Sequence, residues 1–325
     1  MNTKRILFCV LAALCACLLT ACAAPDAAPP PAEDTLLLGF SQLGSESGWR
    51  IGNTLSIQEA AAEAGVQLMF DNAEQSQEKQ IKALRSFIAY QVDVIAFSPI
   101  VEEGWEHVLT EAKNAGIPVL LVDRYIKAED DSLYAGRIGS DFTEEGRKAG
   151  RFLIERTQDM AEVRIVELTG TEDSTPMLQR GEGFRGELSG DSRFVLLDSR
   201  SGDFLRSKGR ECMEYFLETY DDIDVLYSHN DSMTLGAIEA IEEKGLVPGQ
   251  DIVIISVDGE QQAIDLLKAG KINCVVECTP LFGAQVMELA KQLKAGETIP
   301  RVIYTDETVF TEFDQNLDTL TPRGY

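Results

Sequence analysis

Short apolar runs alternate with amphipathic stretches along almost the whole chain from residue 36 onward. The runs at 92–97 and 252–255 are rich in Val and Ile, which is typical of parallel strands buried on both faces. The stretch 77–89 instead spaces its apolar residues three and four apart, as a helix with one buried face does. This alternation predicts an α/β fold built on parallel sheets. The expected strands are 36–42, 66–71, 92–98, 118–123, 163–168, 194–198, 224–228 and 252–257, and a further helix is expected over 143–157.

The alternating part of the chain has a length of about 290 residues, which is more than one hydrophobic core usually serves. We therefore expect two lobes or two domains. A chain of this size can bury a sizeable core in each of them.

The ends of the expected strands are more informative than their middles. Successive runs finish in polar residues, among them Asp123 with Arg124, Asn230 with Asp231, and Asp258. In open α/β sheets ligands bind in the crevice outside the carboxyl ends of the strands. The alternative is that these residues are only helix caps and turn formers, which is true of many Asp, Asn and Ser side chains. Arginine is not among the usual capping or turn-forming residues, so this alternative explains Arg124 poorly. The strand ends therefore predict a ligand site.

The N-terminus has the pattern of a signal peptide. Lys4 and Arg5 precede an apolar stretch, 6–19, that is shorter than the roughly 20 residues needed to span a bilayer. The Leu-Thr-Ala-Cys ending at Cys22 resembles a bacterial lipobox, which predicts a lipoprotein signal peptide over 1–21 and lipid attachment at Cys22. An ordinary secretory signal followed by an incidental cysteine is the alternative.

The residues after this cysteine are rich in Pro and Ala, so 22–34 is interpreted as a semi-rigid tether rather than part of a core. The folded part is then expected to begin near residue 35. These features place the chain outside the cytoplasm, anchored to the outer face of the cytoplasmic membrane or held in a periplasm.

The chain is strongly acidic, with 54 Asp and Glu residues against 29 Lys and Arg and a formal net charge of −25. Loss of the leader would remove only two of the positive residues. An acidic surface of this size repels phosphates, so nucleic acids and anionic membrane surfaces are poor candidate partners.

Three cysteines remain after Cys22, namely Cys212, Cys274 and Cys278, and an odd number gives no disulfide framework. No Cys-x-x-Cys pair occurs, and the chain has only two histidines. We interpret the three cysteines as small buried hydrophobic residues and predict neither a metal site nor a cofactor, with a metal or redox role as the less favoured alternative.

Familiar catalytic motifs are absent: the sequence has no Gly-x-Ser-x-Gly elbow, Walker loop or His-Glu-x-x-His. Pairs of carboxylates are expected by chance in so acidic a chain and do not indicate glycosidase chemistry. His229 could be a general base, but a structural histidine at a strand end is the favoured interpretation. The sequence therefore indicates a binding protein rather than an enzyme.

The polar residues at the strand ends are suited to a small neutral polyol. Carboxylates and amides accept from vicinal hydroxyls, and a guanidinium donates to ring and hydroxyl oxygens. Trp49 and Phe204 are candidates to cover the apolar C–H face of a sugar. Packing in the core or between lobes is an equal alternative for Trp49, and a solvated surface position is an alternative for Arg50 and Arg180.

Six segments together resemble the periplasmic sugar-binding proteins of the ribose/galactose type, which serve ABC importers. These segments span nearly the whole chain after the tether, and they are 39–50 (GFSQLGSESGWR), 121–124 (LVDR), 180–184 (RGEGF), 201–204 (SGDF), 229–233 (HNDSM) and 257–259 (VDG). The first and fourth segments, and the closing Gly324-Tyr325, are similar to the galactofuranose-binding branch.

The resemblance implies the type I periplasmic binding protein fold, in which two similar doubly wound parallel-sheet lobes are joined by a hinge of three crossings. It places the N-terminal lobe at 35–140 plus 279–308 and the C-terminal lobe at 141–278 plus 309–325. A ligand would lie in the cleft, and the lobes would close over it by bending at the hinge.

The resemblance also implies which residues bind the ligand. Phe204 would stack on the sugar, and the spacing leaves open whether Glu277 or its neighbour Cys278 faces the cleft. The full implied set is Trp49, Arg50, Asp123 and Arg124 from the first lobe, with Asp141, Arg180, Phe204, Asn230, Asp258 and Glu277 from the second.

The leading hypothesis is a lipid-anchored, monomeric receptor that closes on a monosaccharide, a furanose similar to galactofuranose, and delivers it to an ABC permease. The alternative is a receptor that reports its ligand to a membrane signalling partner. A sugar-responsive transcription repressor shares this fold, but the leader and the acidic charge count against it.

Overall fold

The computed structural model describes residues 35–325, and these contain two six-stranded sheets. The first sheet has the order β11-β5-β4-β3-β1-β2, with β1 (Leu37–Gln42), β2 (Gln67–Asn72), β3 (Val94–Phe97), β4 (Val119–Val122), β5 (Gly136–Gly139) and β11 (Val302–Tyr304). The second has the order β12-β10-β9-β8-β6-β7, with β6 (Val163–Thr169), β7 (Phe194–Ser201), β8 (Val225–Ser228), β9 (Val253–Asp258), β10 (Cys274–Glu277) and β12 (Val309–Thr311).

Helices follow the strands in the regular alternation that the sequence predicts. They are α2 (Gly48–Glu63), α3 (Gln77–Ala89), α4 (Glu106–Asn114), α5 (Phe142–Arg156), α6 (Thr175–Leu188), α7 (Arg206–Thr219), α8 (Asp231–Glu243), α9 (Gln261–Lys268) and α10 (Gly283–Lys294), with two 3-10 turns at Asp131–Leu133 and Leu317–Thr319. Within residues 35–325, no helix is both long enough and apolar enough to cross a membrane.

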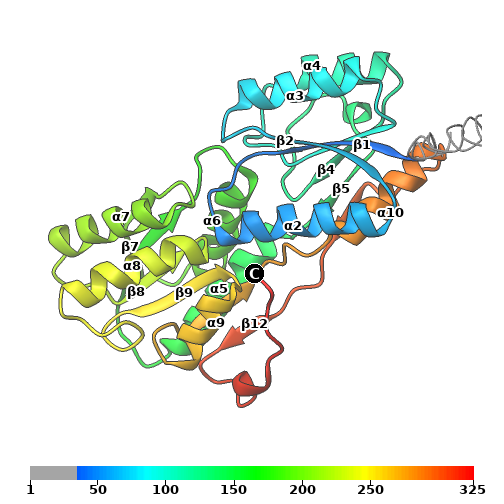
Figure 1. Ribbon diagram of the computed structural model, residues 1–325. Coiled ribbons are helices and arrows are strands. Elements are labelled where there is room, and N and C mark those ends of the chain that lie inside the picture. Colours follow the sequence, from blue (N-terminus) through cyan, green and yellow to red (C-terminus); the bar gives the residue numbers. More distant parts are fainter. Residues whose placement is uncertain (1–34) are drawn as a thin grey trace, which may run out of the picture. The chain divides into compact units, whose positions relative to one another are not determined.

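The first lobe consists of the first sheet with α2 and α10 on one face and α3 and α4 on the other (Figure 1). Successive residues of a strand point to opposite faces, and this explains the two cores. Val94 packs with the α2 and α10 face, whereas Ile95 packs with the α3 and α4 face. The strands are buried on both faces, which is why they are nearly continuous apolar runs.

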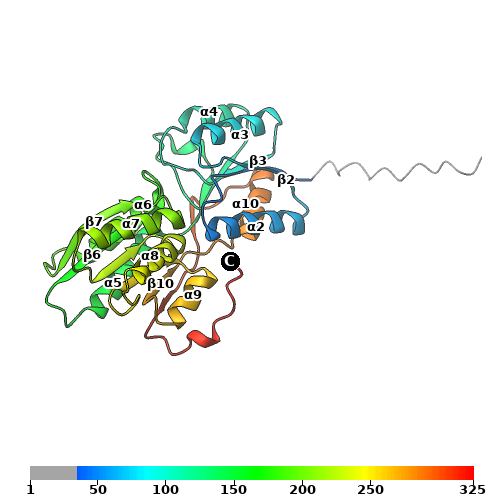
Figure 2. The same cartoon turned by 60° about the vertical axis from the view of Figure 1, so that its left-hand side comes forward.

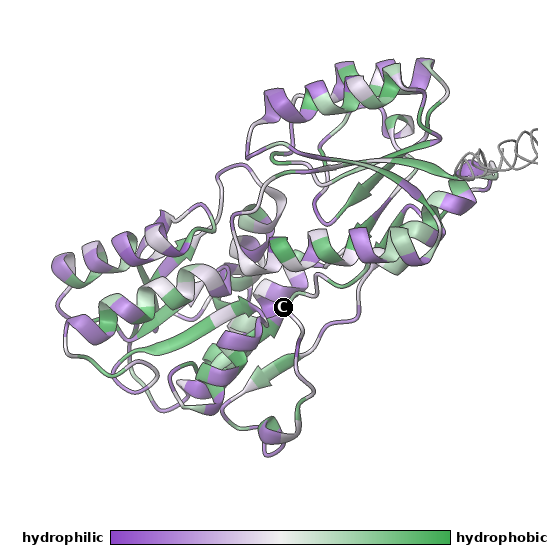
Figure 3. Ribbon diagram, in the orientation of Figure 1, coloured by the Kyte–Doolittle hydropathy of each residue, from purple (hydrophilic) through white to green (hydrophobic). Residues whose placement is uncertain are grey.

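The second lobe repeats this arrangement around the second sheet (Figure 2). Ile165 packs toward α5 and α6, whose residues Phe142 and Phe184 belong to the same cluster, while Val166 packs toward Phe216 of α7. Figure 3 shows the central strands in the colour of apolar residues and the helices in both colours, as expected for helices with one buried face.

The chain passes between the two sheets three times. The first passage joins β5 to α5, the second joins β10 to α10, and the third joins β11 to β12. The proposed lobe boundaries at 140/141, 278/279 and 308/309 lie in these three connecting segments. Neither lobe is therefore made from one continuous stretch of sequence.

Two doubly wound α/β lobes are the architecture that the sequence predicts, and each of the eight expected strands lies within two residues of an observed one, except that β7 extends to Ser201. The expected helix over 77–89 coincides with α3. Four observed strands are not among the eight expected ones: β5, which contains two glycines and no apolar run, β10, and the three-residue edge strands β11 and β12. β12 also runs antiparallel to β10.

Candidate functional site

A pocket lies between the carboxyl ends of the two sheets. Its free volume is about 20 Å³, which is small for a cavity, since holding one water takes roughly 10–15 Å³. Its lining residues come from both lobes: Glu46, Ser47, Trp49, Arg50, Asp123 and Arg124 from the first, and Phe142, Pro176, Arg180, Phe204, Asn230, Asp258 and Cys278 from the second lobe and the segment after β10.

Arg50 is the centre of a buried charge network in the first lobe. It lies in the first turn of α2, where the Ser47 hydroxyl accepts from its backbone N–H at 3.2 Å and caps the helix. Its guanidinium donates to Asp123 at 2.8 Å and to Glu46 at 3.1 Å. Burial alone would lower the pKa of Arg50, but these two carboxylates outweigh it and raise the pKa above its ordinary value.

Arg124 follows β4 and is far less well paired. Its Nη1 donates to the carbonyl oxygen of Ile100 at 3.0 Å, and its guanidinium carbon lies 5.3 Å from the centre of the Phe204 ring. Its buried Nε has no hydrogen-bond partner, since Asp123 is 3.9 Å away. Burial and the neighbouring Arg50 lower the pKa of Arg124 to about 10. The pocket thus contains a buried donor that the protein does not satisfy.

Glu46 provides the matching unfilled acceptor. One of its carboxylate oxygens binds Arg50, and the other, Oε2, is buried without a partner. A buried polar atom left unpaired costs about 1–3 kcal/mol. A donor and an acceptor that are both unfilled in one pocket are what a hydroxyl-bearing ligand would satisfy, because a hydroxyl both donates and accepts.

Arg180 of α6 is the corresponding cation of the second lobe. Its Nε donates to Glu145 at 2.7 Å, and its Nη2 lies 3.6 Å from Asp258. Burial acts to lower the pKa of Arg180, but the nearby negative groups, led by Glu145, raise it well above its ordinary value. Burial raises the pKa of Asp258 well above its ordinary value, although Arg180 opposes the shift.

Asn230 holds the second wall of the pocket in place. Its Oδ1 accepts from the backbone N–H of Met233 at 2.9 Å and caps α8, while its Nδ2 donates to the carbonyl oxygen of Phe204 at 3.3 Å. This amide therefore connects the start of one helix to the loop that carries the aromatic ring.

Three pocket residues have a backbone conformation that L-residues seldom adopt. The φ angles are +66° at Asp123, +61° at Phe204 and +123° at Asp258. Such conformations cost about 1–3 kcal/mol each and persist where the surrounding structure fixes them, most often at functional sites. At Asp123 the close neighbour is Gly139, where a Cβ atom would lie 2.5 Å from the Asp123 carbonyl oxygen.

Direct contacts join the two lobes on both sides of the pocket. On one side, the Glu260 carboxylate accepts from the backbone N–H of Trp49 at 2.9 Å, at the start of α2. On the other side, the Thr175 hydroxyl donates to the carbonyl oxygen of Tyr125 at 3.1 Å. The Trp49 ring nitrogen also donates to the carbonyl oxygen of Cys278 at 2.6 Å. The structure therefore shows the lobes in contact around the pocket.

Of the ten ligand-binding residues expected from the sequence, eight line this pocket: Trp49, Arg50, Asp123, Arg124, Arg180, Phe204, Asn230 and Asp258. Asp141 does not, because its carboxylate caps α5 by accepting from the backbone N–H of Glu144 at 3.0 Å. Glu277 does not either, because it pairs with Arg323 and accepts from the backbone N–H of Thr308. Lipid attachment at Cys22 and the segments 1–21 and 22–34 lie outside the described residues.

At the second crossing, Cys278 lines the pocket and Glu277 lies outside it. The sequence left this choice open because consecutive residues near a strand end point in opposite directions. Four further residues line the pocket that were not expected from the sequence: Glu46, Ser47, Phe142 and Pro176. Glu46 and Ser47 lie inside the segment that carries the resemblance, and the cap position before a helix was the available signal for them.

His229 is structural, as the sequence analysis favoured. It is fully buried outside the pocket lining, and its Nε2 lies 3.0 Å from Glu167. Burial lowers the pKa of His229, and the hydrogen bond to Glu167 opposes this shift. The imidazole is therefore a neutral donor to a buried carboxylate.

Comparisons with known proteins identify the family. The sequence model of the periplasmic binding protein domain matches residues 38–298. The chain belongs to the periplasmic binding protein family. This membership confirms the resemblance found in the sequence and the type I fold of two parallel-sheet lobes.

Several members of the family are substantially similar to the chain. The galactofuranose-binding protein YtfQ of Escherichia coli is 39% identical over 279 residues, which covers 85% of this chain and 87% of that protein. A Mycobacterium smegmatis structure in complex with β-D-fucofuranose has 48% identity and a TM-score of 0.84, covering 86% and 92% of the two chains. The arabinofuranose-bound protein of a Shewanella arabinose ABC transporter has 43% identity and a TM-score of 0.83, covering 87% and 93%.

These relatives are substrate-binding proteins of transporters and not enzymes, so the expectation that the chain is not an enzyme is confirmed.

Proposed function

We propose that the chain is a lipid-anchored extracytoplasmic receptor that binds a monosaccharide, a furanose of the galactofuranose kind, between its two lobes and delivers it to an ABC importer. The observation that carries the proposal is the pair of unfilled hydrogen-bonding atoms in the pocket, Arg124 Nε and Glu46 Oε2. A sugar hydroxyl would satisfy both, and each charge-assisted hydrogen bond contributes about 1.5–3 kcal/mol.

The rest of the pocket supports a sugar over other small molecules. Asp123, Asn230 and Asp258 supply acceptors or an amide for hydroxyl groups, and Phe204 supplies an apolar ring face. Three arginines and three acidic residues line the pocket, so no large net charge selects for an ion. The eight expected residues that line the pocket are proposed to bind the sugar.

The furanose assignment is supported by three similar structures. The structures at 48%, 43% and 38% identity are bound to fucofuranose or arabinofuranose or are named as a galactofuranose-binding protein. The ribose-import binding protein of Bacillus subtilis is only 28% identical.

Delivery would depend on closure of the two lobes, and the described structure is proposed to be the closed form. The contact between Glu260 and Trp49 and that between Thr175 and Tyr125 would form only when the lobes meet. A ligand that binds the closed form better shifts the balance toward it in proportion to its differential affinity. A permease that recognises the closed form would then respond to occupancy.

The cellular location follows from the family and from the N-terminal sequence. Membership of the periplasmic binding protein family supports a place outside the cytoplasm. The proposed signal peptide at 1–21, the lipid on Cys22 and the tether at 22–34 would hold a monomeric receptor at the outer face of the membrane. The proposed lobes remain 35–140 plus 279–308 and 141–278 plus 309–325.

A receptor for a membrane signalling partner is the second candidate function. The observation that favours it is the similarity to the fructose-binding periplasmic domain of a hybrid two-component system, which has 25% identity and a TM-score of 0.79. The same sugar site would serve both functions. A pull-down of the membrane partner from the native organism separates them, since a permease and a sensor kinase differ in composition.

The test of sugar binding is a thermal-shift screen of the purified chain against pentoses, hexoses, galactofuranose, polyols and nucleosides. A ligand at a concentration 100 times its Kd stabilises the folded state by about 2.7 kcal/mol and raises the Tm. We expect one sugar to give a selective shift that is lost in Arg124→Ala, and a crystal structure of that complex to show a furanose ring. A shift with nucleosides alone, or with no compound, would contradict the proposal.

A further inference from the structure

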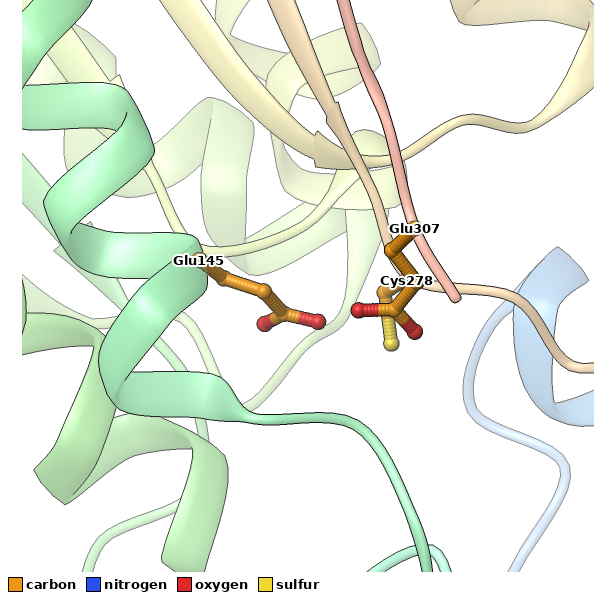
Figure 4. Close-up of side chains that lie close together, drawn as sticks. All are labelled: Glu145, Cys278 and Glu307. Carbon is orange, nitrogen blue, oxygen red and sulfur yellow. The ribbon is translucent and has the colours of Figure 1, made fainter. Parts of the chain in front are cut away.

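Three side chains meet where the two lobes are connected, and of these only Cys278 also lines the pocket. They are Glu145, in the first turn of α5, Cys278, directly after β10, and Glu307, between β11 and β12. One ligand atom from each, two carboxylate oxygens and a sulfur, lies within 4.8 Å of the other two. Figure 4 shows the Glu145 carboxylate directed toward the side chains of Cys278 and Glu307. Each of the three passages between the lobes thus lies beside one of these residues.

Glu145 carries an unfilled oxygen at this place. The residue is fully buried, and only its Oε2 is bound, by Arg180 Nε at 2.7 Å. Its Oε1 is buried with no hydrogen-bond partner. An orphaned carboxylate oxygen in the interior is costly, because a buried acceptor loses its water without a replacement.

The hydrogen bonds of Glu307 fix its carboxylate beside this oxygen. Glu307 Oε1 accepts from the Thr305 hydroxyl at 2.8 Å, from the backbone N–H of Thr279 at 3.1 Å and from the Ser140 hydroxyl. The Ser140 oxygen is also 3.3 Å from the Cys278 sulfur. Donors that orient a carboxylate in this way are typical of the outer sphere of metal sites.

Within residues 35–325 no hydrogen bond joins Glu145 to Glu307. Burial, and after it the negative charge of Glu145, raises the pKa of Glu307 to about 8, so this carboxyl holds a proton near neutral pH when no cation is bound.

We propose that Glu145, Cys278 and Glu307 form a binding site for one divalent cation of the zinc class. Two carboxylates and a thiolate carry three negative charges, and the neighbouring Arg180 carries one positive charge, so a divalent cation brings the group to neutrality. Zn²⁺ accepts both sulfur and oxygen ligands and commonly takes three protein ligands and a fourth, open position. Ca²⁺ and Mg²⁺ prefer oxygen ligands alone, so the thiol disfavours them.

The cation can reach this site from the pocket, and the protons that it displaces can leave to solvent. Cys278 lines the pocket between the lobes, which gives the cation a path from solvent. Coordination replaces the proton of the Cys278 thiol and the proton of the Glu307 carboxyl, and both pass to solvent as the metal binds. A bound cation would link segments that belong to all three crossings, so it would stabilise this region without any sugar present.

The test is a titration of the metal-free chain with Co²⁺ and then Zn²⁺ in the absence of sugar, so its result does not depend on the proposed sugar function. We expect Co²⁺ to bind with one-to-one stoichiometry and a thiolate-to-cobalt charge-transfer absorption, and Zn²⁺ to displace it. The absorption should vanish in Cys278→Ser and remain in Cys274→Ser, which changes another buried free cysteine, in the strand that precedes Cys278.

Glu307→Gln keeps the thiol and provides a second test if Cys278→Ser folds poorly. Its affinity for Co²⁺ should fall by about 100-fold or more, since loss of even outer-sphere partners costs about 10–100-fold. An absorption that persists in Cys278→Ser, an unchanged affinity in Glu307→Gln, or no one-to-one binding of either metal to the unmodified chain would overturn the site.

Discussion

Arg180 and Arg124 face the same pocket from opposite lobes, but the protein holds them in different ways. Arg180 lies 2.7 Å from Glu145 and 3.6 Å from Asp258, so its charge is balanced by its own lobe. Arg124 donates only to the carbonyl oxygen of Ile100 and leaves its Nε unpaired. The side of the pocket formed by the first lobe, the first wall, therefore has a hydrogen-bond donor that only a ligand can fill. On the side formed by the second lobe, the second wall, the arginine is already paired.

This difference separates two uses of the same side chain. A buried arginine with carboxylate partners contributes mainly to the position and stability of the wall, because its loss leaves buried negative charges without a partner. A buried arginine with an unused donor contributes mainly to recognition, because only the bound molecule satisfies it. Substitutions that affect folding and substitutions that affect binding should accordingly fall on opposite walls.

The largest expected effect is a loss of the free energy of unfolding in Arg180→Met. Removing this guanidinium leaves Glu145 and Asp258 buried without their cation, and breaking a buried ion pair costs about 3–5 kcal/mol. Denaturant unfolding of the sugar-free protein measures this loss. Arg206→Met is the matched control, because Arg206 pairs with Glu239 at the surface and such pairs contribute about 0–1 kcal/mol. Equal losses in the two variants would contradict the comparison.

The next largest expected effect is a loss of sugar affinity in Arg124→Ala. Two lost charge-assisted hydrogen bonds of about 1.5–3 kcal/mol each would lower the sugar affinity by a factor of a hundred or more, which abolishes binding in most assays. Calorimetric titration measures the affinity, and the sugar-free Tm should stay within a few degrees of the unmodified value.

Arg124→Lys sharpens the test, because it keeps the charge and loses the planar fork that donates to two oxygens at once. We expect most of the affinity to be lost in this variant as well. Retained affinity in Arg124→Ala would show that the first wall does not recognise the sugar.

Asn230→Ala should weaken the second wall by a smaller amount. The change removes the cap of α8 and the hydrogen bond to the Phe204 carbonyl, and loss of such a cap costs about 0.5–2 kcal/mol. Both the Tm and the sugar affinity should fall. Ser76→Ala removes the cap of α3, away from the pocket, and should lower the Tm alone. A loss of affinity in both variants would point to a general effect of stability.

Glu260→Gln tests the contact between the two walls. The carboxylate accepts from the Trp49 N–H at the start of α2, and a negative charge at a helix N-terminus contributes about 0.3–1 kcal/mol. We expect the sugar affinity to fall about two- to fivefold if this contact forms only on closure, with little change in the sugar-free Tm. Glu106→Gln, in the first turn of α4, should leave the affinity unchanged.

The smallest expected effect is on the pH dependence of stability, through the buried His229. Burial lowers the folded-state pKa of His229 below 6.5, so the unfolded chain takes up a proton first as the pH falls. Stability should therefore decline from this source by at most about 0.7 kcal/mol between pH 7 and pH 6. His229→Gln should remove this part of the pH dependence, and His107→Gln, at an exposed histidine, should not.

The sequence predicts the fold and part of the candidate site because each strand end can be recognised from the residues on either side of it. An apolar run gives the strand, and the polar residue after it, such as Asp123 or Asp258, must lie at the carboxyl edge of the sheet. Parallel strands bring these edges together whatever their distance in sequence. Asp123, Arg124, Asn230 and Asp258 reach the pocket for this reason, whereas Trp49, Arg50, Arg180 and Phe204 were expected there from the family resemblance.

The remaining positions depend on local choices that no run of residues reveals. Asp141 and Asn230 both cap helices, but only Asn230 also lines the pocket. Glu277 and Cys278 differ by one residue, so the end of β10 decides which of them turns inward. Glu145 meets Glu307 only because three connecting segments converge, which the sequence does not show.

The three passages between the sheets have a consequence for how the polypeptide acquires its structure as it is made and exported. Helix α2 packs against α10, and β5 pairs with β11, so the first lobe lacks two of its elements until residues 283–304 have emerged. The apolar face of α2 stays uncovered through most of synthesis. A chain that completes its first half last remains extended for longer, and an extended chain is the form that can be threaded across a membrane.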